Sequence, residues 1–349
     1  MRRLVICIVG GSLALMLMAG PVLACGGLVA PNGSVNLVRT TTLAAYADGI
    51  EHYVTSFEFS GGGGGKFGSI VPLPDVPSDV RKGGRWTLQR LVQEVQPPVA
   101  LRATFESGAD ESSAKARVLL ETRVSALDIT VLEGGGDEVG NWARTNGFNL
   151  PPDAPEVLDF YAERSPIFMA VRFNLKRAEA KELRVGDGIP VHLTIPTDRP
   201  WVPLRILGLG RSAEEVVEAD VFLLTERKPA LLPQVGSPTS NQGLFLERSE
   251  PASEFLLADL RSDRGMRWLP ESGMWLDYIR ISTPARLLNH DLAIDVAGGA
   301  PSLVDAGFAV PSSSLPVPDD ATLWWPWVAA VAFGAAFIAA TNKLSASRR

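Results

Sequence analysis

The sequence predicts an α+β fold: a β-rich domain dominated by an antiparallel or mixed sheet, with a few short helices. Short runs that alternate apolar and polar side chains recur along the chain, which is typical of half-buried strands. Only a few segments have the i, i+3, i+4 spacing of an amphipathic helix, and turn-forming residues separate them from the strands. With 349 residues and 46% hydrophobic content, the chain can form one large or two ordinary domains.

The first predicted element is a β-hairpin. Residues 43–47 and 50–59 flank Asp48 and Gly49, a dipeptide typical of a two-residue hairpin turn. The second arm alternates with a period of two, as a strand does. Glycines at 61–65 then interrupt the chain before another extended run.

Helices are predicted next. Residues 88–95 place apolar side chains at i, i+3, i+4 and i+7, and the prolines at 97–98 stop this helix. A second helix is expected over about 137–145, because Asn146 and Gly147 form a C-terminal stop.

A third helix has a start signal of its own. Asp153 is the expected N-cap, Pro155 the first helical residue and Glu156 the capping-box glutamate. Its apolar face consists of Val157, Leu158, Phe160 and Tyr161. A further helix is expected over 254–260.

Apolar and β-branched runs predict the remaining strands. They cover residues 118–120, 127–132, 167–175, 189–195, 202–207, 221–225 and 275–282. Residues 228–242 are rich in proline, serine, glycine and asparagine, which favours a linker or long loop.

The first 24 residues have the pattern of a signal peptide. Arg2 and Arg3 precede a mostly apolar run over 4–19, and small residues stand before a predicted cut after Ala24. The apolar run is shorter than the roughly 20 residues that a membrane span needs. We therefore expect cleavage; the alternative is an uncleaved anchor.

The C-terminal part of the sequence predicts a transmembrane helix. Residues 323–341 are 19 residues without charge, and tryptophans cluster at their start, as they do at a lipid–water interface. Lys343, Arg348 and Arg349 follow this segment, so the positive-inside rule places the C-terminus in the cytoplasm. We expect a single-pass cell-membrane protein with its ectodomain outside; a buried core helix is the alternative.

These signals divide the chain into six parts. They are a signal peptide (1–24), an extracytoplasmic domain (25–230), a loop and accessory β-rich part (231–310), a stalk (311–322), the span (323–341) and a cytoplasmic tail (342–349). Without the five basic residues of the two ends, 28 basic residues oppose 39 acidic ones, so the ectodomain carries −11. This balance argues against nucleic acid as a partner.

Cys25 is a possible lipidation site. The residues before it partly resemble a bacterial lipobox, and a lipid would add a second membrane anchor. Alternatively, Cys25 is an unmodified mature N-terminus, or it pairs between molecules, because Cys7 leaves with the signal peptide.

No motif assigns a catalytic, cofactor-binding or metal-binding residue. Ser60 and Phe67 stand where a phosphate-binding loop requires Gly and Ser or Thr. The sequence also lacks the G-x-S-x-G of a serine hydrolase and the H-E-x-x-H of a zinc protease. His52 and His192 fall in predicted strands with one exposed face; for these two and His290 a structural or surface role is expected.

Acidic residues leave two possibilities open. Asp259, Asp263 and Asp291 are calcium candidates by charge alone, because no D-x-D-x-D-G loop is present. The sequence also allows a hydrolase whose two catalytic carboxylates are brought together by folding. Asn32 begins a weak glycosylation sequon.

Glycine, proline and apolar positions carry a family resemblance. Residues 25–27 and 67–74 resemble the start, and 127–133, 146–148, 168–173 and 201–205 the core, of domain-of-unknown-function family 2330, a family of exported bacterial proteins. The resemblance covers about 25–232. Members often carry a second cysteine shortly after the first; residues 28–30 lack one here. The resemblance implies an exported, often membrane-tethered protein, and no activity.

The predicted function is that of a membrane-tethered, non-catalytic module that binds, scaffolds or senses something at the bacterial surface. The predicted tail of about eight residues is too short for a signalling domain, so sensing requires an envelope or membrane protein as partner. No cofactor is expected. The alternative is an extracytoplasmic hydrolase that uses a carboxylate pair.

Overall fold

The fold is seen in a computed structural model, which describes residues 22–23, 27–29, 39–57, 68–95, 116–183, 188–235 and 243–308. All of them belong to one unit that ends at Phe308. Apart from the short strand β1 (Val22–Leu23), the predicted signal peptide lies outside these residues. So do Cys25, Asn32, the glycine run, the stalk and the predicted span, which therefore stay predictions. Within the described ranges, no helix is long and apolar enough to cross a membrane.

An eight-stranded mixed sheet forms the centre of the fold. Its order is β14-β15-β12-β3-β4-β10-β6, and β1 pairs with the start of β3. The β12–β3 and β1–β3 pairs are parallel, and the other pairs are antiparallel. The strands are β3 (Arg39–Ala47), β4 (Ile50–Phe57), β6 (Asp79–Lys82), β10 (Ile189–Pro196), β12 (Val216–Thr225), β14 (Leu244–Pro251) and β15 (Trp275–Pro284).

Two smaller antiparallel sheets accompany it. The five-stranded sheet has the order β2-β5-β9-β8-β7 and the three-stranded sheet the order β11-β16-β13. The strands are β2 (Gly27–Val29), β5 (Gly68–Pro72), β7 (Arg117–Val124), β8 (Leu127–Glu133), β9 (Ile167–Phe173), β11 (Trp201–Val202), β13 (Ala230–Leu232) and β16 (Leu292–Asp295). The predicted α+β class, with mixed and antiparallel sheets and few helices, is confirmed.

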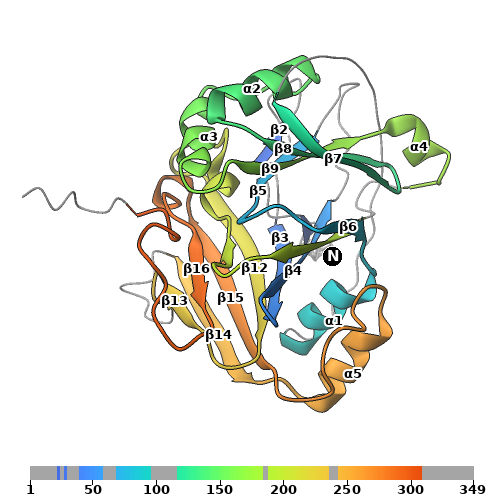
Figure 1. Ribbon diagram of the computed structural model, residues 1–349, viewed down its shortest axis with the longest axis vertical. Helices are drawn as coiled ribbons and strands as arrows, with labels where there is room; N and C mark the ends of the chain where they lie inside the picture. Colours follow the sequence, from blue (N-terminus) through green and yellow to red (C-terminus); the bar gives the residue numbers. More distant parts are fainter. Residues whose placement is uncertain are drawn as a thin grey trace, which may run out of the picture. The chain divides into compact units, whose positions relative to one another are not determined.

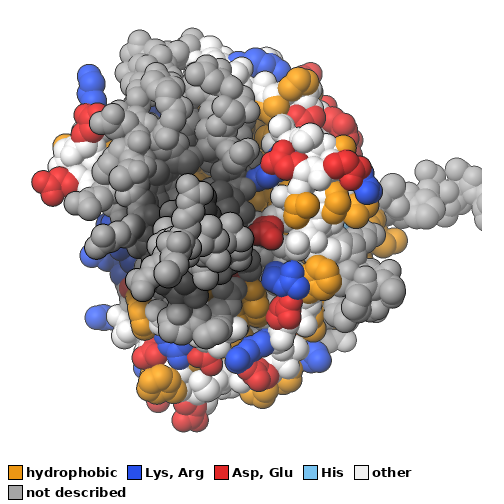
Figure 2. All heavy atoms as spheres, turned by 180° about the vertical axis from the view of Figure 1, so that it is seen from behind, with side chains coloured by type: hydrophobic (Ala, Val, Ile, Leu, Met, Phe, Trp, Pro, Cys, Tyr) orange, Lys and Arg blue, Asp and Glu red, His pale blue; other side chains and the backbone are white. Residues whose placement is uncertain are grey.

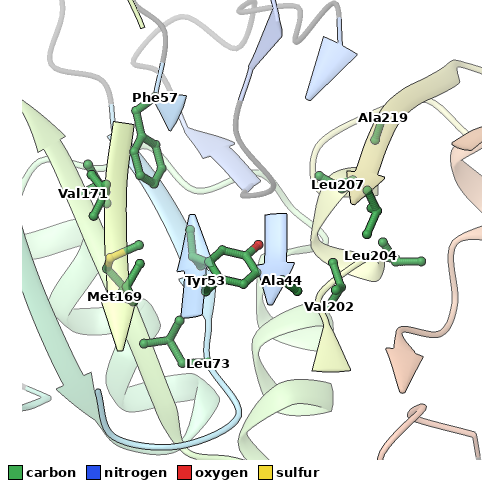
Figure 3. Packing of buried hydrophobic residues seen from close by; sticks show 14 of the residues in the cluster. Ala44, Tyr53, Phe57, Leu73, Met169, Val171, Val202, Leu204, Leu207 and Ala219 are labelled. Atoms are coloured by element: carbon green, nitrogen blue, oxygen red, sulfur yellow. The ribbon is translucent and has the colours of Figure 1, made fainter. Parts of the chain in front are cut away.

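The two large sheets pack face to face around the main core. Tyr53 and Leu193 of the eight-stranded sheet and Val131 and Met169 of the five-stranded sheet belong to one buried apolar cluster, part of which Figure 3 shows. Each of these side chains is at most 1% exposed. Because side chains alternate along a strand, the neighbouring residues point to the outer faces of the sheets.

Helices cover both outer faces, which gives four layers (Figure 1). The helices α2 (Gly136–Thr145) and α3 (Ala154–Ala162) pack on the five-stranded sheet through a cluster that includes Leu132 and Phe168. The helices α1 (Trp86–Val95) and α5 (Glu254–Ser262) pack on the eight-stranded sheet through a cluster that includes Leu91, Phe222 and Leu260.

Local sequence signals explain several of these elements. The predicted hairpin is confirmed as β3 and β4, and both turn residues have positive φ, 53° at Asp48 and 76° at Gly49. Aspartate and glycine tolerate this conformation better than most residues do. The predicted stop after α2 is also confirmed, because Gly147 has a φ of 83°.

The start of α3 differs from the prediction. Asp153 has the expected position, but its backbone is helical and its side chain makes no capping hydrogen bond. Its carboxylate instead accepts a hydrogen bond from the backbone N–H of Gly210, at 2.9 Å. Glu156 forms an ion pair with Arg205 rather than a capping box. Both acidic side chains therefore bond to residues that are distant in the sequence, and neither caps the helix.

Some predicted boundaries were wrong. The strand expected over 167–175 ends at Phe173 and gives way to α4 (Leu175–Glu179). The strand expected over 202–207 is β11 followed by the 3₁₀ helix η1 (Arg205–Gly208). The segment 228–242 contains β13, and a second 3₁₀ helix, η2 (Ala285–Leu287), follows β15. Strands β6, β14 and β16 were missed because short strands depend on their partners rather than on local propensity.

Candidate functional site

A row of charged side chains crosses the outer face of the five-stranded sheet. In the register of β7, β8 and β9, Arg123 lies opposite Asp128, and Asp128 lies opposite Arg172. Their neighbours Ile129 and Val171 belong to the core between the sheets, so alternation directs the charged row outward.

A hollow of about 520 Å³ lies over this row. The helices α2 and α3 cover the part of the face near Leu132 and leave the charged row open. The floor also includes Glu121 and Thr130, which lie opposite each other on β7 and β8. The wall consists of Trp142, Asn146 and Phe148, at and just beyond the end of α2.

Guanidinium groups outnumber carboxylates around Asp128. Oδ1 of Asp128 lies 2.5 Å from Nη2 of Arg177 and 3.6 Å from Nε of Arg123, and Oδ2 lies 3.9 Å from Nη2 of Arg172. The side chain of Arg123 is 81% exposed, whereas that of Asp128 is 24% exposed. One carboxylate cannot satisfy all the donors of three arginines, since each guanidinium carries five N–H groups.

The wall depends on a glycine of β5. A Cβ atom at Gly68 would lie 2.3 Å from Cε1 of Phe148 and 2.5 Å from the carbonyl oxygen of Val171. Real Cβ contacts are essentially never that short, so only glycine lets the Phe148 ring lie against the strand. Asn146 is held in turn by a 2.9 Å hydrogen bond from Nδ2 to the carbonyl oxygen of Trp142.

The polar groups of the hollow suit the binding of an anion. Arg123 and Arg172 offer donors in the fork geometry that matches carboxylate and phosphate oxygens. Trp142 and Phe148 add an apolar wall beside these donors.

The structure brings two of the three histidines together. Nδ1 of His52 lies 3.0 Å from Nε2 of His192, and the His52 ring stacks on Trp268 with 3.7 Å between ring centroids. Both histidines are buried, so the prediction that these two strands have one exposed face is wrong. Burial is the main cause that lowers the pKa of His52 to about 4 and that of His192 to about 3. Arg81 contributes to both shifts, and His52 contributes to that of His192.

His290 is also a buried side chain. It stacks on Phe308, and its Nδ1 lies 3.0 Å from Oδ1 of Asn289. Burial lowers the pKa of His290, and the nearby Asp291 opposes this shift.

The three aspartates considered for calcium are engaged by donors. Asp259 pairs with Arg90 at 2.7 Å, and Asp263 accepts hydrogen bonds from the backbone and hydroxyl of Thr87. Asp291 is fully buried and forms an ion pair with Arg164. Across the described ranges, no group of three histidine, cysteine or acidic side chains is arranged to hold a metal ion.

Sequence reasoning missed the residues of the hollow. Most of them lie in ordinary strand or helix patterns, and Arg123, Asp128 and Arg172 belong to three different strands. The alternation of charged and apolar residues could have indicated one outward face, but the register that joins the strands is a tertiary property.

The sequence profile of a family described as an uncharacterized protein conserved in bacteria, DUF2330, matches residues 21–229. The chain belongs to this family. The match confirms the resemblance drawn from the glycine, proline and apolar positions, and it includes every residue that lines the hollow.

Other comparisons add little to the DUF2330 assignment. No curated protein gives a significant match to this chain. Among solved structures, the crystal structure of baculovirus P35 is similar at 9% sequence identity and a TM-score of 0.40. That similarity covers 77% of this chain and 99% of the P35 chain. A likeness of this degree does not bear on the function of the DUF2330 chain.

Proposed function

We propose that this DUF2330 chain is a membrane-tethered, non-catalytic binding protein of the bacterial envelope. We further propose that its ligand occupies the hollow on the five-stranded sheet. The observation that carries this proposal is the row Arg123–Asp128–Arg172 on the floor of a hollow of about 520 Å³. Ligand sites are commonly concave and combine apolar walls with a few convergent polar groups.

The ligand that suits this chemistry is a small solute with a carboxylate or phosphate group. Its anionic oxygens would accept hydrogen bonds from Arg123 and Arg172 in place of the long contacts to Asp128. Its less polar part would lie against Trp142 and Phe148. Asp128 keeps the arginines in place when the ligand is absent, and it excludes anions that cannot compete for them.

The tether is proposed from the two ends of the sequence. The signal peptide, the uncharged segment 323–341 and the basic residues after it support an ectodomain outside the membrane and a C-terminus in the cytoplasm. Mass analysis of the mature N-terminus tests both cleavage after Ala24 and lipidation of Cys25. A mass that matches an unmodified Cys25 at the N-terminus would rule out lipidation. A mass that still includes residues 1–24 would rule out cleavage.

The alternative function is hydrolysis by a carboxylate pair. Glu121 and Asp128 both line the hollow from neighbouring strands, which is the observation that favours it. We place it second because ion pairs with three arginines engage the oxygens of Asp128, and a carboxylate engaged in this way is poorly placed to take a proton from water or to attack a substrate. If the protein hydrolyses a substrate and the variant Glu121→Gln does not, hydrolysis becomes the favoured function.

The test uses the full chain in mild detergent and a panel of carboxylates, sugar acids and sugar phosphates. A true ligand at about 100 times its Kd raises the free energy of unfolding by about 2.7 kcal/mol, which appears as a higher melting temperature. Arg172→Ala is expected to abolish this shift. Arg117→Ala is the matched control, because Arg117 lies on β7 outside the hollow and pairs with Glu133. Equal shifts in both variants, or no shift with any panel member, would overturn the site.

A further inference from the structure

The floor of the hollow consists of two rows of side chains that differ in chemistry. Both rows cross β7, β8 and β9, and on each strand they are two residues apart, so they point to the same face. We call them the charged row (Arg123, Asp128, Arg172) and the neighbouring row (Glu121, Thr130, Ala170). All six residues line the hollow.

The two rows suit different parts of one ligand. The charged row offers the guanidinium donors that bind an anionic group. In the neighbouring row, Glu121 is exposed and Thr130 is half-buried. A carboxylate accepts hydrogen bonds without donating any, and a threonine hydroxyl does both. Glu121 therefore binds hydroxyl groups and repels a second anionic group, so the end of the ligand away from the charged row is neutral and hydroxylated.

The spacing of the rows fits a six-membered sugar ring. Residues two apart on a strand are separated by about 6.4–6.8 Å. A pyranose ring that carries a carboxylate on one side and hydroxyl groups on the other extends over such a distance. Ala170 adds little bulk beside Thr130, which leaves room for a ring over the neighbouring row. The hollow, of about 520 Å³, also has the usual size of a small-molecule site.

The wall of the hollow favours a polar ring over a long apolar chain. Trp142 is 9% and Phe148 5% exposed, so together they present only a narrow apolar strip to a ligand. Because apolar stabilisation grows with the area buried, this strip offers little to an alkyl tail. It is sufficient for the C–H groups of one sugar ring, and the amide of Asn146 beside it adds a further hydrogen-bonding group.

The charges around the hollow favour a carboxylate over a phosphate ester. Three guanidinium groups surround Asp128, and Glu121 contributes a second carboxylate to the floor. An anion with a single charge balances these described groups. A phosphate ester carries about −1.5 to −2 near pH 7, and the excess charge would lie beside Asp128, where like charges repel.

Long-range attraction does not replace these contacts. The whole chain carries a net charge of −6, and acidic and basic side chains are interspersed over the described part of the face in Figure 2. A surface of mixed sign on an acidic protein draws anions only weakly from a distance. The choice among anions therefore depends on the groups inside the hollow.

Building on the function proposed above, we propose that the hollow binds a hexuronate, a sugar acid with one carboxylate. The carboxylate accepts hydrogen bonds from Arg123 and Arg172. The ring hydroxyls on the opposite side bind Glu121 and Thr130, and the ring itself lies against Trp142. A free hexuronate and the end unit of a uronate-containing chain share this chemistry.

The test measures affinities by titration calorimetry with the full chain in mild detergent. Glucuronate and galacturonate are compared with three probes of the same ring size: cyclohexanecarboxylate, glucose and glucose 6-phosphate. The better hexuronate is expected to bind at least about tenfold more tightly than cyclohexanecarboxylate, which leaves Glu121 and Thr130 without hydroxyl partners. It should exceed glucose, which lacks the anionic group, by at least about a hundredfold. Digalacturonate that binds more tightly than galacturonate would indicate the end of a chain as the natural source.

Two variants test the neighbouring row. Thr130→Val and Glu121→Gln should each weaken hexuronate binding at least about fivefold and change cyclohexanecarboxylate binding less than about twofold. Glu133→Gln is the matched control, because Glu133 pairs with Arg117 at the other end of β8, and it should change neither affinity by more than about twofold. The comparison of ligands on the unaltered chain needs no variant, so a variant that fails to fold does not decide the result.

The outcomes separate the class of ligand from the site itself. Equal binding of hexuronates and cyclohexanecarboxylate, or tighter binding of glucose 6-phosphate, would overturn the hexuronate and leave the anion site of the proposed function in place. Equal loss of hexuronate binding in Glu121→Gln and Glu133→Gln would overturn the role of the neighbouring row. If none of these anions binds, the proposed function of the hollow fails, and the hexuronate fails with it.

Discussion

Nδ1 of His52 lies 3.0 Å from Nε2 of His192, although 140 residues separate them in the chain. A hydrogen bond between two imidazoles requires one ring to donate and the other to accept, so the two rings cannot both be protonated in this arrangement. The lowered pKa values, about 4 for His52 and about 3 for His192, make both rings neutral at pH 7. Adjacent strands β4 and β10 place them on the same outer face of the eight-stranded sheet, where the Trp268 ring stacks on His52.

This pair is expected to make the fold sensitive to acid. In the unfolded chain both histidines take up protons below about pH 6.5, whereas in the folded protein their pKa values are about 4 and about 3. The unfolded state therefore binds more protons between these limits, and stability falls as the pH is lowered from 6.5 towards 3. The loss is on the order of a few kcal/mol. Urea unfolding at a series of pH values measures it.

The variant His192→Leu should flatten the acid limb of that profile. It also removes the hydrogen bond to His52, so the slope against pH is the informative quantity rather than the absolute stability. Thr194→Val, two residues further along the same face of β10, is the control and should keep the slope. An unchanged slope in His192→Leu would mean that other groups cause the acid sensitivity.

Glu51 is expected to give the opposite pH dependence. It is fully buried between the sheets, and neither carboxylate oxygen has a hydrogen-bond partner among the described residues. Burial raises its pKa to about 8, so the unfolded state loses this proton at a lower pH than the folded state does. Stability therefore falls as the pH rises from about 4.5 to about 8.

Substitution of Glu51 tests this explanation directly. At pH 7 the raised pKa corresponds to about 3 kcal/mol of lost stability. Glu51→Gln stays neutral at every pH and should regain a large part of this free energy, with no gain near pH 4. Glu218→Gln, at an exposed position of β12, should change stability by less than about 0.5 kcal/mol. A destabilised Glu51→Gln at pH 8 would contradict the buried neutral acid.

The buried pair of Arg164 and Asp291 is expected to be essential for folding. Besides this ion pair, Asp291 accepts hydrogen bonds from the Tyr161 hydroxyl at 2.8 Å and from the backbone N–H of Leu204 at 2.7 Å. Asp291→Asn leaves the guanidinium of Arg164 without its counter-ion and should cost about 3–5 kcal/mol. Glu214→Gln breaks an exposed pair and should cost less than about 1 kcal/mol. Chemical denaturation measures both variants. If Asp291→Asn and Glu214→Gln lose the same free energy of unfolding, burial does not determine how much an ion pair contributes in this protein.

Two glycine-to-alanine substitutions should have opposite signs. Gly68→Ala places a methyl group against Phe148 and a backbone oxygen, so it should cost about 1–3 kcal/mol and alter ligand binding in the hollow. Gly140→Ala lies within α2, where the nearest atom to the new methyl group is 3.6 Å away, and should stabilise the protein by about 0.5–1 kcal/mol. Thermal unfolding compares the two. A neutral Gly68→Ala would mean that the wall of the hollow can move.

The sequence by itself determined the elements whose signals are local. The Asp48-Gly49 turn, the stop of α2 at Gly147 and the apolar faces of α1 and α5 all follow from backbone conformation or from side-chain spacing along one segment. The same kind of signal carried the α+β class and the DUF2330 resemblance, because glycine, proline and apolar positions record the fold.

Only the tertiary structure decided which side chains meet. Arg123, Asp128 and Arg172 form one row because the register of three strands aligns them, and a shift of one residue would turn each to the other face. The neutral histidine pair likewise depends on the pairing of β4 with β10. Such contacts join residues far apart in the chain, and spacing along a single sequence carries no information about them.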